Sequence, residues 1–250
     1  KKFETKFVPT KPIFINSIPK SGTHLLRNII AHFIDERYIH WNFVHYETLD
    51  EAQNELLQGE KKLFTGHLPK DFKTSTFASK CNMLTLIRDP YDLVLSTAKF
   101  LYSEIIPWNR IGHYIQANEI SVQETISYVI SGVQLGNDGI PRLSESYLKW
   151  GIQWFDDAVQ VIRFEDLIYH INNINNKESE IYFSNIFNSI GIIDLPKDWK
   201  DRVISGADRN ISLTSAVVKN IDKSQFKLTE NHKKMIEVIA SNLRKTLGYA

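Results

Sequence analysis

The sequence predicts an α/β fold of three layers, in which a central, mainly parallel β-sheet is flanked by helices. Short apolar runs that indicate buried strands alternate along the chain with segments whose apolar residues recur at helical spacing. This alternation favours parallel strands, because each return to the same edge of a sheet needs a crossover, usually a helix. With 250 residues and no internal repeat, we expect a single domain over residues 1–250.

The predicted elements follow one another in a regular order. Residues 24–35 place apolar side chains at the period of an amphipathic helix, and Pro90 suits the first position of a helix. Asp89 can cap that helix or pair with Arg88. The predicted strands are 12–17, 62–65, 83–87 and 159–164, and the predicted helices are 24–35, 50–57, 91–104, 142–155, 179–190 and 231–247.

The composition excludes several classes of protein. Hydrophobic residues make up 42% of the chain, and the net charge is +1, so no overall positive field favours nucleic acid as a partner. Cys81 is the only cysteine, which excludes an internal disulfide. No apolar run approaches the roughly 20 residues of a membrane span, and we expect a cytoplasmic protein.

The turn after the first predicted strand has the chemistry of an anion site. Pro19-Lys20-Ser21-Gly22-Thr23 joins a strand end to a helix start, where backbone amides and the helix dipole favour an anion. Gly22 allows close approach of the backbone, Ser21 and Thr23 carry hydroxyl donors, and Lys20 brings a positive charge. The strand–turn–helix order indicates a P-loop-like fold, although the glycine that opens a Walker A motif is missing. A simple turn containing Lys and Gly is the alternative.

Residues 18–26 resemble the P-K-S-G-T-T-W-L signature of the cytosolic-type, bacterial-like small-molecule sulfotransferases, which use 3′-phosphoadenosine 5′-phosphosulfate (PAPS). The resemblance implies that Lys20, Ser21, Gly22, Thr23 and His24 hold the 5′-phosphosulfate. His24 stands where the family has Thr, and the next residue is leucine where the family has the Trp that stacks on adenine.

A second segment is similar to the family's R-[DN]-P-x-D-x-x-x-S pattern. Arg88 follows the predicted strand 83–87, and Ser96 lies eight positions further on. The resemblance implies that both bind the 3′-phosphate of the nucleotide, and that Ser96 also contacts Lys20. Arginine at a strand end suits this role because its guanidinium binds phosphate through two hydrogen bonds. An Arg–Asp pair beside a capped helix is the alternative.

His67 is the candidate general base. Thr65-Gly66-His67-Leu68-Pro69 resembles the family's T-x-H-L-P segment, whose histidine takes the proton of the acceptor. Its place after a short strand puts it at the edge where open α/β sheets bind ligands. His40 and His45 flank Trp41 and Phe43, and are expected either to line the acceptor pocket or to be ordinary loop residues.

Two further residues are assigned by weaker matches. Phe164 stands where the family has a tyrosine near adenine, with a core aromatic as the alternative. Lys219 stands where the family has an arginine in a loop that closes over the 3′-phosphate, but both glycines of that loop are replaced.

Together these resemblances imply a PAPS-dependent sulfotransferase that needs no metal. His67, Lys20 and Ser96 are the expected catalytic residues, and transfer is in line to a hydroxyl or amine of a small organic acceptor. We expect an enzyme of secondary metabolism. The sequence is compatible with a homodimer as well as with a monomer. Aromatic and imidazole side chains in residues 101–119 are expected to overhang the site, with a satellite hydrophobic cluster as the alternative: Tyr102, Trp108, His113 and Tyr114. A P-loop-type small-molecule kinase and a catalytically silent nucleotide-binding domain remain alternative functions.

Overall fold

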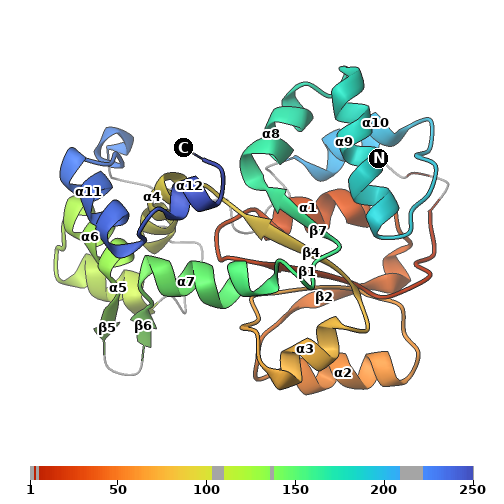
Figure 1. Ribbon diagram of the computed structural model, residues 1–250, viewed down its shortest axis with the longest axis horizontal. Coiled ribbons are helices and arrows are strands. Elements are labelled where there is room, and N and C mark those ends of the chain that lie inside the picture. The colour runs from red at the N-terminus through yellow and green to blue at the C-terminus, as the bar shows by residue number, and fades with distance from the viewer. Residues whose placement is uncertain (1–2, 4–5, 103–109, 136–137, 209–221, 250) are drawn as a thin grey trace. The chain divides into compact units, whose positions relative to one another are not determined.

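A five-stranded, fully parallel β-sheet is the main feature of the computed structural model (Figure 1). The structure describes residues 3, 6–102, 110–135, 138–208 and 222–249. β1 lies at the centre of the sheet, between β3 and β4, and all five of its residues are buried. In spatial order the strands are β2 (Ile39–Val44), β3 (Leu63–Gly66), β1 (Ile13–Ser17), β4 (Asn82–Ile87) and β7 (Gln160–Arg163).

Helices cover both faces of this sheet (Figure 1). Ile13 and Ile15 of β1 pack on one face, under α1 (Thr23–Ala31), α8 (Phe164–Asn172), α9 (Lys177–Ser189) and α10 (Trp199–Gly206). Phe14 faces the opposite side, where the core includes residues of α2 (Leu49–Leu57) and α3 (Phe72–Ala78). This is the predicted three-layer α/β fold.

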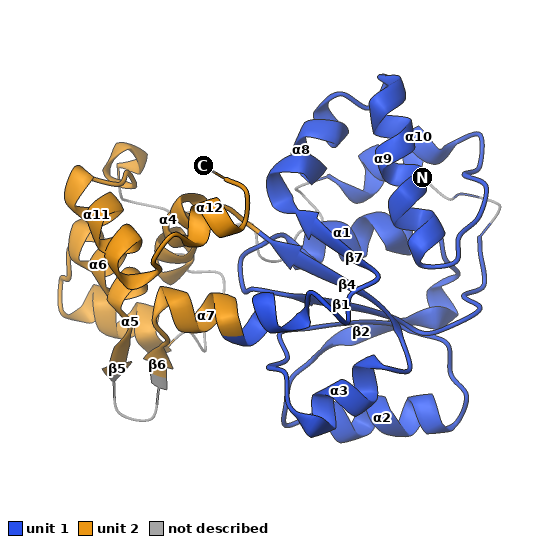
Figure 2. Ribbon diagram, in the orientation of Figure 1, with its two compact units in different colours: residues 1–87, 149–212 blue, residues 88–148, 213–250 orange. Residues whose placement is uncertain are grey.

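The chain divides into two compact units, which Figure 2 distinguishes by colour. Unit 1 comprises Lys1–Ile87 and Lys149–Ser212 and holds the parallel sheet. Unit 2 comprises Arg88–Leu148 and Leu213–Ala250. Its elements are α4 (Pro90–Leu101), α5 (Arg110–Ala117), α6 (Val122–Ser131), the hairpin β5–β6 (Val133–Leu135, Asp138–Ile140), most of α7 (Leu143–Trp150), α11 (Glu230–Ile239) and α12 (Leu243–Thr246).

All four predicted strands are present, but three predicted helices end early or are broken. α1 stops at Ala31 because the following segment pairs with the backbone of Phe7 instead. The helix expected over 142–155 breaks at Gly151 into α7 and a 3₁₀ turn (Ile152–Trp154). The helix expected over 231–247 breaks near Asn242, whose φ of 57° no α-helix allows. Two further 3₁₀ turns occupy Glu36–Tyr38 and Lys223–Gln225.

Cys81 lies buried just before β4, and its thiol is not in a disulfide. Burial raises the pKa of this thiol to about 12.

Across the described ranges, no helix is long and apolar enough to cross a membrane. The single domain expected over residues 1–250 stays a prediction.

Candidate active site

The loop between β1 and α1 adopts a conformation that depends on glycine. Lys20 and Gly22 both have positive φ, at 71° and 97°. A Cβ atom at Gly22 would lie 2.5 Å from Cδ2 of Phe164, the first residue of α8. The Phe164 ring therefore packs directly against the loop backbone, and Gly22 is required both by its φ and by this contact.

The same loop has the features of an anion-binding site. Among the described residues, no side chain caps the amino end of α1 at Gly22. The first amides of the helix can therefore donate hydrogen bonds to an external anion. Within that part of the chain, Ser21 Oγ is buried and has no hydrogen-bond partner. A buried hydroxyl without a partner is unfavourable, and an oxyanion at the loop would supply the missing acceptor. The residues present therefore fit a phosphate or sulfate group.

His67 lies at the carboxyl end of β3, beside this loop. Its Nδ1 is 2.7 Å from the backbone carbonyl oxygen of Ser17 and 3.1 Å from Ser17 Oγ. Ser17 Oγ also forms a short hydrogen bond with Thr23 Oγ1, so Ser17 connects the histidine to the first residue of α1. Because a carbonyl only accepts, Nδ1 carries the proton, which leaves the lone pair of a neutral ring on Nε2.

The environment of His67 keeps its imidazole neutral. The pKa of His67 is lowered to about 3, mainly by burial; the Ser17 hydrogen bond opposes this shift, and the positive potential of His24, His45 and Lys20 adds to it. A neutral imidazole with a free Nε2 lone pair is the state that a general base needs before it takes a proton.

His24 shares this environment. Burial lowers the pKa of His24 to about 4, with Arg27 and Lys20 contributing in the same direction. The ring of Phe43 packs against both imidazoles, with its centre 5.5 Å from that of His24 and 4.6 Å from that of His67. Unit 1 thus brings together the loop, His24, His67 and Phe164, as the sequence predicted for one site.

A pocket of about 440 Å³ opens next to His67. His45 lines this pocket. His40 is not among the lining residues and instead bonds to Glu55 Oε2 at 3.1 Å and packs on Phe64. The lining residues are His45, Tyr46, Glu47, His67, Pro69, Asp71, Lys149 and Trp150.

Several of these lining residues were not found from the sequence. Tyr46 and Asp71 are hydrogen-bonded to each other, and Asp71 caps α3 by accepting from the Thr74 amide at 2.8 Å. Only the cap had a local signal, the capping box of Asp71 with Thr74. Trp150 lies within the predicted 142–155 helix, and it is half-buried at the pocket.

The remaining predicted site residues belong to unit 2 or lie outside the described residues. Arg88 directly follows the last residue of β4, and its carbonyl accepts a short hydrogen bond from the Tyr147 hydroxyl. Ser96 is half-buried on α4. Asp89 caps α4 and pairs with Arg244 at 2.9 Å. Lys219 and Trp108 lie outside the described residues.

The aromatic stretch expected to overhang the site is in part core. Tyr102 is 7% exposed, packs edge-on against Phe226 and hydrogen-bonds to the Ile120 carbonyl. For Tyr102 the alternative, a satellite hydrophobic cluster, therefore fits the structure, because its hydroxyl and ring are used inside unit 2. His113 and Tyr114 of α5 are exposed.

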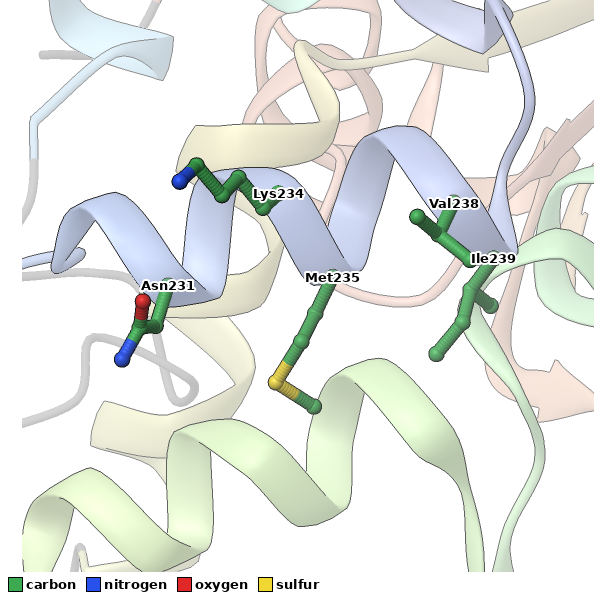
Figure 3. Close-up of a pocket in the computed structure, with 5 residues that line it drawn as sticks. All are labelled: Asn231, Lys234, Met235, Val238 and Ile239. Carbon is green, nitrogen blue, oxygen red and sulfur yellow. The ribbon is translucent and has the colours of Figure 1, made fainter.

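A second pocket, of about 370 Å³, lies on α11 of unit 2 (Figure 3). Its lining residues are Asn231, Lys234, Met235, Val238 and Ile239, and they include neither an imidazole nor a carboxylate. Catalysis of group transfer needs a base or a polarising group, so the pocket beside His67 is the better candidate. Within the described ranges, no group of three or more His, Cys, Asp or Glu residues could hold a metal ion.

Comparison with known proteins identifies the family of the chain. The sulfotransferase domain family matches residues 10–180, and the chain belongs to this family. The fold is similar to that of mouse sulfotransferase SULT7A1 complexed with PAP, at 15% identity and a TM-score of 0.60, covering 98% of this chain and 91% of that one. Retinol dehydratase in complex with androsterone and inactive cofactor PAP aligns at 12% identity and a TM-score of 0.47, covering 94% of this chain and 82% of that one. The search of curated proteins finds no match.

Proposed function

We propose that this sulfotransferase moves a sulfuryl group from PAPS to a hydroxyl or amine of a small organic acceptor. The observation that carries the proposal is the connection through Ser17, which ties an anion-binding loop to a neutral histidine. A loop that fits an anion beside a base is what transfer of an anionic group requires.

In this proposal, the loop residues of unit 1 bind the donor, and His67 of the same unit acts on the acceptor. The amides of the Lys20–Thr23 loop and the Ser21 hydroxyl bind the 5′-phosphosulfate, and Lys20 compensates negative charge on the leaving nucleotide. When bound, PAPS supplies the activated sulfuryl group. His67 takes the proton of the acceptor on Nε2, while the Ser17 carbonyl holds Nδ1–H and fixes the tautomer.

The other nucleotide contacts are proposed from the resemblance to the family. Arg88 and Ser96 bind the 3′-phosphate, and Lys219 assists them. Phe164 and His24 border the nucleotide, and Phe164 already packs against the phosphosulfate loop at Gly22.

The acceptor is proposed to bind in the pocket beside His67. Its volume of about 440 Å³ lies in the range of sites for small organic molecules, and Tyr46 and Trp150 give it aromatic surface. A role in secondary metabolism, a cytoplasmic location and a homodimer stay predictions.

His67→Ala tests the assignment of the base. We expect turnover to fall by about 10²- to 10⁴-fold, which is the usual contribution of general-base catalysis. An acceptor screen that measures 3′,5′-bisphosphate formation, with mass spectrometry for the added sulfo group, gives the activity. Calorimetry of nucleotide binding is the control and should be nearly unchanged. Wild-type turnover in the variant would contradict the assignment.

Arg88→Ala tests the nucleotide site. Removal of a charged phosphate donor should weaken 3′,5′-bisphosphate binding by about 10- to 100-fold, since such hydrogen bonds contribute about 1.5–3 kcal/mol. Isothermal titration calorimetry measures this, and Arg142→Ala, an exposed arginine of the same unit, is the matched control. Equal affinities in Arg88→Ala and wild type would refute the role of Arg88.

Two other functions predict different results in the same assays. A small-molecule kinase would turn over ATP in the presence of magnesium and would not depend on PAPS. A catalytically silent domain would bind 3′,5′-bisphosphate but transfer no sulfuryl group to any acceptor.

A further inference from the structure

We propose that Asn16 is a positioning residue. Its side chain holds the base, His67, and the pocket-lining residue Trp150 in the geometry that sulfuryl transfer requires. This inference rests on the proposed function, since it concerns how the same site is assembled. The observation behind it is a fully buried carboxamide on the central strand that connects three distant backbone groups.

The contacts of Asn16 use its side chain almost completely. Oδ1 accepts from the Leu68 amide at 2.8 Å. Nδ2 donates to the Leu68 carbonyl at 3.3 Å and to the Trp150 carbonyl at 3.1 Å. Only this orientation of the amide satisfies all three bonds, because the Leu68 amide must donate and both carbonyls must accept.

The bond to the Leu68 amide acts on the peptide that joins Leu68 to His67. It fixes the plane of that peptide from β1, while the carbonyl of Ser17, the next residue of β1, fixes the imidazole through Nδ1. Two neighbouring residues of one rigid strand therefore hold both the backbone and the ring of His67. Trp154 adds a further bond to the Leu68 carbonyl at 2.9 Å, from its indole Nε1.

The bond to Trp150 extends this arrangement to the acceptor side. Trp150 and His67 both line the pocket, although they are far apart in the sequence. Through Asn16, the two sides of the pocket are fixed relative to each other by one side chain. Because a shift of about 1 Å at a reacting group can cost on the order of 10²-fold in rate, such a connection matters for turnover.

Asn16 is a buried polar side chain in an apolar part of the sheet. It lies on the same face of β1 as Phe14, beside a core of apolar side chains. An apolar residue here would avoid burying a carboxamide, but it would leave the Leu68 amide and the Leu68 and Trp150 carbonyls without this partner. Asn16 therefore serves both the fold and the geometry of the site.

Asn16→Leu tests the inference, because leucine has a similar volume and makes none of the hydrogen bonds. We expect kcat to fall on the order of 10²-fold, while 3′,5′-bisphosphate affinity changes by less than about threefold. Phe14→Leu is the matched control, since it weakens packing on the same face of the same strand. It should lower the melting temperature and leave kcat close to that of wild type.

Asn16→Asp gives a readout that a structural role would not move. The introduced carboxyl group, when ionised, faces two carbonyl oxygens, so it should be active only when protonated. Its kcat should rise as the pH falls from about 8 to about 6, whereas that of wild type should not. Nuclear magnetic resonance of the His67 Nδ1–H signal should show broadening in Asn16→Leu and a sharp signal in Phe14→Leu.

Wild-type kcat in Asn16→Leu, or an equal loss of kcat in Phe14→Leu, would overturn the role of Asn16 while leaving the proposed function intact. A loss confined to nucleotide affinity would overturn it as well. Absence of sulfuryl transfer by the wild-type protein across the acceptor panel would instead overturn both.

Discussion

At the scale of single residues, the site depends on polar groups at the end of one strand. Ser17 accepts the Nδ1–H of His67 with its carbonyl and bonds to Thr23 with its hydroxyl. One residue therefore sets the tautomer of the base and contacts the first residue of α1. The neutral ring that results is surrounded by His24, His45 and Lys20, all of which oppose protonation.

The protonation of His67 gives a test at this scale. With a pKa of about 3, well below the usual value near 6.5, His67 should stay neutral as the pH falls through 6.5. Its Cε1–H resonance should therefore show no titration step above about pH 5. Binding of 3′,5′-bisphosphate should raise this pKa, because nearby negative charge favours the imidazolium. A midpoint near 6.5 for His67 in the free protein would contradict the burial argument.

Stability should depend on pH for the same reason. Both His24 and His67 have folded-state pKa values below those of the unfolded chain, so the unfolded state binds more protons below pH 6.5. The free energy of unfolding therefore falls as the pH is lowered from about 6.5 towards 4.

At the scale of elements, the amino end of α4 is held by one carboxylate with two partners. Asp89 accepts from the Tyr91 amide at 2.8 Å and pairs with Arg244 through both oxygens. Arg244 also donates to the Tyr249 carbonyl at 2.8 Å, and its guanidinium lies 4.1 Å from the centre of the Tyr91 ring. The start of α4 and the C-terminal segment of unit 2 are thereby joined.

Asp89→Ala should lower the free energy of unfolding by about 2–3 kcal/mol, since it removes both a helix cap and a partly buried ion pair. Urea titration followed by circular dichroism measures the change. Asp92→Ala, an exposed carboxylate in the same helical turn, should change stability by less than about 0.5 kcal/mol. Similar losses in the two variants would show that the Arg244 pair contributes little.

Some helices and strands could be predicted from the sequence, and others could not. β1, β3 and β4 were found because strands buried on both faces give continuous apolar runs. β2 was missed because its sequence, IHWNFV, includes polar residues and an exposed Trp41. The breaks at Gly151 and Asn242 come from tertiary context, which a helical period does not report.

The residues of the candidate site also differ in whether a local sequence motif indicates them. The loop between β1 and α1 and His67 lie in contiguous motifs, so their residues could be named as candidates from the sequence alone. Asn16, Tyr46 and Trp150 could not, because their importance arises from contacts across the fold. One available signal was Asn16 itself, a polar residue in an otherwise apolar strand.

At the scale of the whole molecule, the two units are interleaved along the chain. Each is made of two separate segments, and the chain passes from one unit to the other after Ile87, Leu148 and Ser212. The family match over residues 10–180 likewise includes parts of both units. Neither unit corresponds to a contiguous piece of sequence that could be expressed alone.

We propose that the two units unfold as one cooperative domain. Differential scanning calorimetry should give a single transition in which the calorimetric and van't Hoff enthalpies agree. Addition of 3′,5′-bisphosphate should raise its midpoint without splitting it. Two resolved transitions, or a shift in only one of them, would show that the units are separate domains.

The buried Cys81 has a practical consequence for studying how the units are arranged. Thiol reagents attack the thiolate, and a pKa of about 12 together with burial leaves almost none of it accessible near neutral pH. A cysteine introduced on the surface of each unit can therefore be labelled with a fluorophore while the native thiol stays silent. Energy transfer between such labels would report the distance between the units in solution, with and without nucleotide, in a chain that keeps its natural cysteine.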